Sequence, residues 1–197
     1  MGKIKLLWYY LFSYPYYKLV MGKIGSRTKL FSPKLTGASA IFLGDKVYIQ
    51  TGSWLAADPV TGEKDCSLVI GDGTYIGRFC HIYATGKISI GKKVLIADKV
   101  YISDNMHGYR DVTLPVIDQP VRQLKAVSIG DGAWIGENAC VVGAAIGRNS
   151  VVGANAVVTS DVPDFCVVAG IPAKIIRRYD FERNEWRKTN EEGAFPG

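Results

Sequence analysis

The chain has 197 residues, of which 48% are hydrophobic, and its formal net charge is +6 at pH 7. This length suits one domain with a core of its own. The charge does not indicate nucleic-acid binding, because no stripe of basic residues alternates with aromatic ones, and an anionic small molecule explains it equally well. The four cysteines show no CxxC spacing, so we expect no disulfide, no metal and a reducing, cytoplasmic location. No uninterrupted apolar run reaches the length of a membrane span.

Residues 1–40 are expected to form an N-terminal segment of their own, dense in Trp, Tyr and Leu and flanked by lysines. Two interpretations stay open. The segment caps the end of the fold, or it is an interfacial anchor, since aromatic and cationic side chains favour the membrane surface. The second interpretation concerns residues 1–20 and would bring the protein to the inner membrane surface. Pro15 argues against one continuous helix here.

Residues 41–173 follow a six-residue pattern in which a branched aliphatic residue recurs and glycine usually comes next. The aliphatic positions are Leu43, Ile49 and Leu55; Ile70, Ile76 and Ile82; Ile90, Ile96 and Ile102; Ile129, Ile135 and Val141; and Ile146, Val152 and Val158. This period is typical of a parallel β-helix, in which three units make one triangular coil and coils stack about 4.8 Å apart. We therefore predict an all-β fold with about five such coils.

The breaks in the pattern all follow the third unit of a coil, so every insertion leaves the same corner of the prism. A solenoid that collects insertions on one face usually has its site there. The longest insertion contains a loop at residues 104–126, whose start lies in the stretch SDNMHG at residues 103–108. Its imidazole, His107, is the residue type that most often serves as general base toward a hydroxyl or an amine. Asp104 lies three residues earlier, where it would orient or stabilise the ring, so we predict both as catalytic residues.

The second histidine, His81, falls on an outward position that the three-per-coil count assigns to a different corner, and we expect a structural or surface role for it. With only two histidines, a zinc site of three histidines within one site is excluded. Acceptor recognition is expected from the loops at residues 56–69 and 104–126. The candidates there, by location alone, are Trp54, Asp58, Tyr109 and Arg110.

The stretch AVSIGDGAWIGENACVVGAAIGRNSVVGANAVVTSDVP, followed by VVAGIPAKIIRR, resembles the left-handed β-helix (hexapeptide-repeat) acyltransferases. The branch it resembles most is that of sugar and polysaccharide O-acetyltransferases, and SDNMHG is similar to the D-x-x-H-G element of the lipopolysaccharide and capsule enzymes. The resemblance covers about residues 41–178. It implies a left-handed β-helix, a homotrimer, and acetyl-CoA as co-substrate in the cleft between neighbouring prisms. It also implies that His107 deprotonates an acceptor hydroxyl, which attacks the thioester directly.

Cofactor contacts follow from the resemblance by motif position. Trp134 resembles the residue that packs against the pantetheine arm of CoA. Ala154 and Thr159 resemble positions that touch the arm and the adenine end through backbone atoms. Lys174 and Arg177 resemble the cations that meet the ribose 3′-phosphate, and we expect them on one turn at the start of a short C-terminal helix.

We therefore expect an acetyl-CoA-dependent O-acetyltransferase that acts on a sugar hydroxyl in surface polysaccharide or lipopolysaccharide biosynthesis. The acceptor is a small molecule or a glycan. N-acetylation of an amino sugar or an antibiotic stays open, because the same base serves an amine. A non-catalytic β-helix subunit that only assembles is a third interpretation, against which the loop histidine argues. Residues 174–197 are expected to form a basic helix and a tail.

Overall fold

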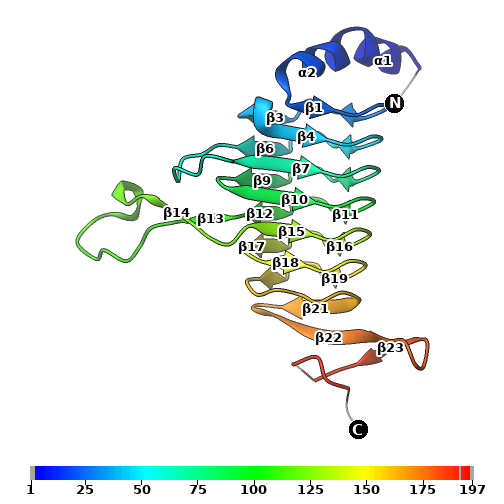
Figure 1. Cartoon of the computed structure of the whole chain (residues 1–197), viewed down its shortest axis with the longest axis vertical. Helices are drawn as coiled ribbons and strands as arrows, with labels where there is room; N and C mark the ends of the chain where they lie inside the picture. The colour runs from blue at the N-terminus through cyan, green and yellow to red at the C-terminus, as the bar shows by residue number, and fades with distance from the viewer. Residues whose placement is uncertain (1–2, 191, 196–197) are drawn as a thin grey trace.

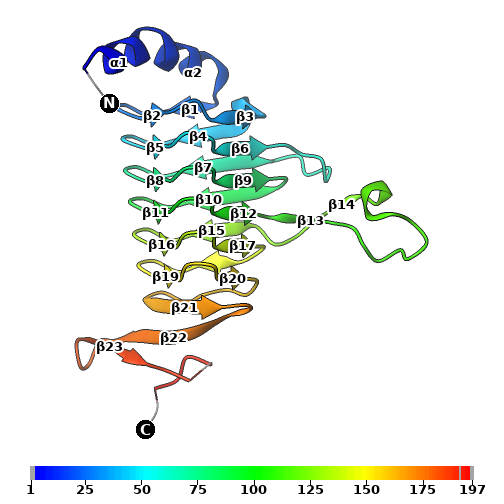
Figure 2. The same cartoon turned by 180° about the vertical axis from the view of Figure 1, so that it is seen from behind.

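The computed structural model describes residues 3–190 and 192–195, and this part of the chain is an all-β prism with a helical segment across one end (Figures 1 and 2). Three sheets form the sides of the prism.

The first sheet contains β1 (Lys23–Ile24), β4 (Ile41–Leu43), β7 (Ser67–Ile70), β10 (Lys87–Ile90), β15 (Val127–Ile129) and β18 (Ala145–Ile146). The second contains β2 (Lys29–Leu30), β5 (Tyr48–Ile49), β8 (Tyr75–Ile76), β11 (Leu95–Ile96), β16 (Trp134–Ile135), β19 (Val151–Val152), β21 (Cys166–Gly170), β22 (Ala173–Asp180) and β23 (Glu185–Lys188). The third contains β3 (Lys34–Thr36), β6 (Trp54–Ala57), β9 (His81–Ala84), β12 (Tyr101–Ser103), β17 (Cys140–Val142) and β20 (Val157–Val158).

Equivalent repeat positions lie one above another along the axis of the prism. In the first sheet, Ile70 pairs in register with Ile90, Ile90 with Ile129, and Ile129 with Ile146. All four side chains are buried, so each coil covers the apolar edge of the next. From β1 to β21 the pairing between coils is parallel, which confirms the parallel β-helix that the six-residue pattern predicts.

The repeated glycine at the second position of a unit follows from the close stacking of coils. Gly130 has no positive φ, but a Cβ there would lie 2.5 Å from the backbone nitrogen of Arg148 in the next coil. The left-handed conformation comes two residues later in the unit, at Gly132 (φ 71°) and Asn149 (φ 50°). Glycine and asparagine adopt it at the lowest cost.

The β-helix begins earlier than the sequence predicts. Strands β1, β2 and β3 pair in parallel with β4, β5 and β6, so residues 23–36 form a coil instead of belonging to an N-terminal segment that ends at residue 40. Ile24 and Leu30 keep the six-residue spacing, whereas Leu35 comes one residue early and hides the third unit. Together, the described strands make six complete coils, and β21 adds one side of a seventh, where about five coils were predicted. A short 3-10 helix, η2 (Ala38–Ala40), connects this first coil to β4.

The helical segment lies across the open end of the first coil (Figure 1). It consists of α1 (Lys3–Trp8), the π-helical turn η1 (Tyr9–Ser13) and α2 (Tyr14–Val20). Pro15 is the second residue of α2, directly after the π-helical turn. The backbone stays right-handed helical at Trp8, Ser13 and Tyr14, so Pro15 coincides with a change of helix type and does not break the segment. The buried Tyr9 hydroxyl donates to the Thr28 carbonyl (3.0 Å) and accepts from the Leu30 N–H (3.2 Å), which ties the segment to the coil beneath it.

The predicted C-terminal helix is wrong. Residues 173–180 form β22, which pairs antiparallel with β21, and β23 pairs antiparallel with β22. The last coil would otherwise leave a row of unpaired backbone groups, and these two strands cover that edge. Tertiary pairing therefore decides the conformation of a segment whose basic side chains also suit a helix.

The longest insertion is a hairpin that projects from the prism (Figure 2). It is formed by β13 (Asn105–His107) and β14 (Val121–Gln123), which pair antiparallel, and its tip contains the 3-10 helix η3 (Val116–Asp118). The loop between β6 and β7 leaves the prism on the same side. Two insertions thus share one corner, as the positions of the breaks predict.

Candidate active site

A hollow of about 280 Å³ lies where the hairpin meets the outer face of the third sheet. Its wall contains both histidines of the chain. The lining residues are Trp54, Val60, His81, Tyr83, Tyr101, Asn105, His107 and Val121. The pocket therefore combines the hairpin with three successive coils.

An aromatic column forms one wall of this pocket. Trp54, His81 and Tyr101 are the first residues of β6, β9 and β12, and strand pairing places them in register. The Trp54 and His81 rings stack with centroids 4.5 Å apart and planes within 7°. The Trp54 indole donates to the Thr36 hydroxyl (3.0 Å), and the Lys34 ammonium lies 3.6 Å from the centre of the Trp54 ring. These contacts hold the platform in one orientation.

His81 lies in the same pocket as His107, so the expectation that it belongs to a different corner is wrong. Its strand pairs directly with β12, the strand that leads into the hairpin, and both histidines face this side of the prism. Burial, and secondarily the charge of Lys34, lowers the pKa of His81, so its imidazole is neutral at neutral pH. Among the described residues, its buried Nε2 atom has no hydrogen-bond partner.

His107 is the exposed last residue of β13 and pairs with Val121 of β14. Within the described part of the chain, its side chain makes no hydrogen bond or ion pair. The backbone of the hairpin therefore sets its position. A side chain so placed at a pocket wall can take a proton from a bound group.

Asp104 holds the start of the hairpin. Its fully buried carboxylate accepts hydrogen bonds from the backbone N–H groups of Thr85 (2.8 Å) and Gly86 (2.8 Å), from the Thr85 hydroxyl (3.2 Å) and from the Asn105 amide (3.3 Å). The expected contact with His107 is not among these bonds. The carboxylate instead fixes the backbone three residues before the histidine.

Gln123 completes this anchor from the other end of the hairpin. Its amide nitrogen donates to the carbonyls of Asp104 (2.8 Å) and Leu124 (3.2 Å), and its amide oxygen accepts from the hydroxyls of Thr85 (2.8 Å) and Thr61 (2.7 Å). Both strands of the hairpin and the β6–β7 loop are thereby joined. We call Asp104, Thr85, Gln123 and Thr61 the hairpin anchor.

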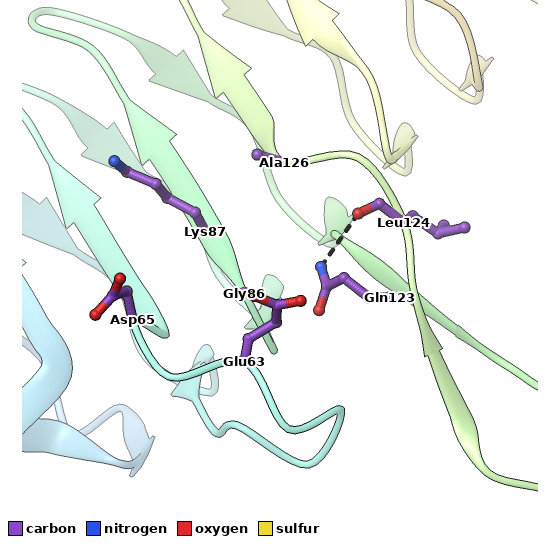
Figure 3. A pocket seen from close by; sticks show the side chains of 7 residues that line it. All are labelled: Glu63, Asp65, Gly86, Lys87, Gln123, Leu124 and Ala126. Atoms are coloured by element: carbon purple, nitrogen blue, oxygen red, sulfur yellow. Dashed lines mark hydrogen bonds between the residues drawn. The ribbon is translucent and has the colours of Figure 1, made fainter.

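Behind the hairpin anchor lies a second hollow of about 340 Å³ (Figure 3). Glu63 and Asp65 approach it from the β6–β7 loop, Lys87 from β10 and Gln123 from β14. It is lined by mixed charges and has neither a histidine nor an aromatic side chain. The groups suited to proton transfer lie in the first pocket.

The residues predicted to contact the cofactor lie on the second sheet, at its corner with the third sheet, and after the last strand of the third sheet. Trp134 has an exposed side chain on β16, between Leu95 and Val151 of the neighbouring coils. Ala154 is exposed in the turn between β19 and β20, and Thr159 is exposed directly after β20. Their contact with CoA stays a prediction.

Lys174 and Arg177 are exposed on β22, so they do not share a helical turn. They pair with Ala169 and Val167, and an irregularity in the register lies between the two pairs. A bulge lets side chains depart from strict alternation between the two faces. That both cations contact one phosphate group therefore stays a prediction.

Sequence reasoning missed the aromatic column and the pocket it lines. Tyr83, Tyr101 and Asn105 were not among the predicted site residues, and Trp54 was included by location only. Aligning the coils by their third units would have found the column, because positions 54, 81 and 101 precede equivalent aliphatic residues. Over the described residues, no group of three or more His, Cys, Asp or Glu side chains could hold a metal ion.

Known proteins share this repeat and this architecture. Residues 126–160 match the family described as the hexapeptide repeat of succinyl-transferase. Over 124 residues the chain is 41% identical to WbbJ of Escherichia coli K12, whose name is "Putative lipopolysaccharide biosynthesis O-acetyl transferase". That match covers 59% of this chain and 63% of WbbJ, so the chain spans less than two thirds of this relative.

Two solved structures share the fold. AntD, an N-acyltransferase from Bacillus cereus in complex with dTDP and 3-hydroxybutyryl-CoA, superposes with a TM-score of 0.72 at 17% identity, over 87% of this chain and 90% of AntD. VCA0836, a hexapeptide-repeat-containing acetyltransferase from Vibrio cholerae complexed with acetyl coenzyme A, gives 0.61 at 24% identity, over 85% and 76%.

The parallel sheets and the hexapeptide repeat fit a left-handed β-helix. Together, the matches confirm the resemblance to the hexapeptide-repeat acyltransferases that the sequence predicts.

The hairpin anchor generates a prediction about Asp104→Asn. The substitution places an amide donor against N–H groups, and we expect a loss of about 2 kcal/mol of local stability. Backbone amides of residues 105–123 should then exchange with deuterium about thirtyfold faster, with amides in the coils unchanged. Asp111→Asn is the matched control, because Asp111 is exposed on the same hairpin and, among the described residues, its carboxylate accepts hydrogen bonds from Thr113 alone. Equal exchange in the two variants would contradict the anchoring role.

Proposed function

We propose that the protein is an acetyl-CoA-dependent O-acetyltransferase that acts on a sugar hydroxyl in surface polysaccharide or lipopolysaccharide biosynthesis. The observation that carries the proposal is the pocket in which His107 of the hairpin and the aromatic column share one wall. The names of WbbJ and VCA0836 support the reaction type and the acyl donor. Residues 41–173, with the loop at residues 104–126, serve as the catalytic domain in this proposal.

The pocket suits a sugar ring. The apolar face of a sugar packs on flat rings such as the Trp54–His81 stack, while hydroxyl groups need polar partners at the edge. Tyr83 lines the pocket, and its hydroxyl donates to the carboxylate of Asp58 (3.0 Å). That carboxylate retains lone pairs for other donors, so the pair supplies polar groups beside the rings. Burial and then Asp58 raise the pKa of Tyr83 to about 12, so this tyrosine stays a hydrogen-bond donor.

His107 acts as the general base in this proposal. Acetyl-CoA supplies the acyl group on a thioester. His107 removes the proton of the acceptor hydroxyl as its oxygen bonds to the acyl carbon, the carbon–sulfur bond breaks, and the proton passes to the departing sulfur. Asp104 acts as a positioning residue, because its carboxylate holds the hairpin backbone and does not contact the ring. No covalent enzyme intermediate is required.

A homotrimer is part of the proposal. The hairpin tip projects from the prism and is strongly apolar, with Val112 94% and Ile117 88% exposed. A projecting tip of this kind is expected to be covered by a neighbouring prism. The free cysteines fit the cytoplasmic location that we also propose.

N-acylation of an amino sugar is the second candidate, and AntD, which is named as an N-acyltransferase, supports it. The O-acetyl assignment is preferred because the chain is 41% identical to WbbJ and 17% identical to AntD. Thiol release with matched hydroxyl and amine acceptors separates the two reactions.

The central prediction concerns His107→Ala. Loss of the general base should lower kcat for thiol release from acetyl-CoA by about a hundredfold to ten-thousandfold, with the Kd of acetyl-CoA unchanged. Purified enzyme, acetyl-CoA and a panel of surface-glycan fragments are sufficient for the assay.

His81→Phe is the matched control, because it keeps a flat aromatic ring against Trp54 and removes the two ring nitrogens that could bind a proton. It should keep kcat within about threefold, since the proposal gives His81 no proton to move. If His81→Phe lost the activity and His107→Ala kept it, the base would be assigned to the wrong histidine.

A second prediction tests the phosphate contacts of Lys174 and Arg177. The double charge reversal Lys174→Glu with Arg177→Glu should raise the Kd of acetyl-CoA about tenfold or more, because two cations that bind a phosphate become anions. Dephospho-CoA lacks the ribose 3′-phosphate, so its Kd should not change. Arg183→Glu, on the exposed turn between β22 and β23, is the control. Equal weakening of both ligands would show that the two cations act elsewhere.

A further inference from the structure

We propose that the helical end of the prism docks on an anionic membrane surface, with the outer face of α1, η1 and α2 seated among the lipid headgroups. This inference is independent of the reaction and rests on the shape, exposure and charge of the first coil and the helices above it (Figure 1). Over the described residues no helix is long and apolar enough to cross a membrane, so contact would be peripheral.

The outer face of the helical segment is apolar and exposed. Its side chains repeat at helical spacing, and each is more than half exposed: Leu7, Trp8, Leu11, Phe12, Tyr16 and Leu19. Scattered apolar residues on a surface are ordinary, but a contiguous helical face of this kind marks an interaction site. Trp, Tyr and Phe are also the side chains that favour the membrane interface.

This face is held in place by the opposite side of the same helices. Tyr9, Tyr17 and Met21 are buried on the first coil, and the Tyr9 hydroxyl makes two hydrogen bonds to backbone groups there. On the outer side, the Trp8 and Phe12 rings stack with centroids 4.9 Å apart. The apolar face is therefore presented in a fixed orientation.

An apolar hollow extends this surface toward the prism. It measures about 460 Å³ and lies between Trp8 and Phe12 of the helices and Leu30 and Phe31 of the first coil. Apolar side chains on both of its sides would let acyl chains or headgroup carbons settle between helix and coil. The contact area is thus wider than the helix alone.

The charge of this end selects the partner. Residues 1–44 contain seven of the 24 Lys and Arg residues and none of the 18 Asp and Glu residues, so the rest of the chain is slightly acidic. Lys18, Lys23 and Arg27 are exposed around the helices and the first coil. Cations around an apolar face are attracted to anionic lipids.

The same charge argues against a second copy of the chain as the occupant. An end-to-end dimer would bring two such cationic ends together with no acidic side chain among residues 1–44 to compensate them. Like charges facing each other disfavour that contact. An anionic lipid surface matches both the apolar face and the cations.

Flotation of the full-length protein with lipid vesicles tests the proposal. The protein should float with vesicles that mix phosphatidylcholine and phosphatidylglycerol, and about tenfold less with phosphatidylcholine alone or at high salt. The double variant Leu11→Asp with Phe12→Asp should lose flotation. The charge reversal Lys18→Glu with Lys23→Glu should lose the preference for the anionic lipid.

Phe181→Asp is the matched control, because it puts the same charge on an exposed aromatic site in the turn between β22 and β23, at the opposite end of the prism (Figure 1). It should float like the wild type, and unchanged thermal unfolding of all variants would show that they are folded. Absence of wild-type flotation, or equal flotation of the Leu11→Asp, Phe12→Asp variant, would overturn the proposal. Light scattering supplies a further test. If the wild type formed an assembly that only the Leu11→Asp, Phe12→Asp variant lost, the face would bind a second copy of the chain, and the proposal would be overturned.

Discussion

The narrow axis of the prism is the constraint on which the rest of the structure depends. Each coil offers one branched aliphatic side chain per side, and Ile76, Ile82 and Ile96 are fully buried there. No coil can bury these side chains without its neighbours, so the chain must keep the six-residue pattern from one coil to the next. Extra residues can only leave at a corner. The regular axis thus determines where a loop with a chemical role is allowed.

The same register orders the outside of the prism. Because equivalent positions stack, the outward residues before each buried isoleucine form columns, and one such column contains Trp54, His81 and Tyr101. The hairpin returns to this column and is fixed there by Asp104 and Gln123. A rigid wall from the scaffold and one histidine from an insertion together make the pocket. Placing functional groups on such a scaffold limits their motion.

The coils could be predicted from the sequence because each one depends on a short pattern, an aliphatic residue every six positions, that recurs along the chain. Leu35 shows the limit, since a unit shortened by one residue concealed a whole coil that only its pairing with β6 reveals. The strand β22 was predicted as a helix. It is a strand because it pairs with β21 at the open edge of the last coil, and no local sequence pattern encodes that pairing. His81 was assigned to another corner because it was counted as the last residue of the unit that begins at Ile76. It starts β9 directly before Ile82 and therefore lies on the side of the prism that leads into the hairpin. Asp104 was found, but its hydrogen bonds to Thr85 and Gly86 are long-range and invisible in SDNMHG.

The two proposed surfaces are compatible in space. β12, which leads to His107, belongs to the fourth coil, so about 14 Å of stacked strands separate it from the first coil under the helices. The hairpin of β13 and β14 leaves the side of the prism, several coils away from α1 and α2 (Figure 2), so docking of the helical end would leave this hairpin beside the membrane and not against it. An acceptor carried by a lipid would then lie within reach of the site.

A crystal structure of the protein with acetyl-CoA and an acceptor glycan would test the role of His107 most directly. We expect a sugar ring against Trp54 and His81, with one hydroxyl about 3 Å from a ring nitrogen of His107. That role would be contradicted by a sugar bound in the hollow at Lys87 and Gln123, or by a thioester far from His107.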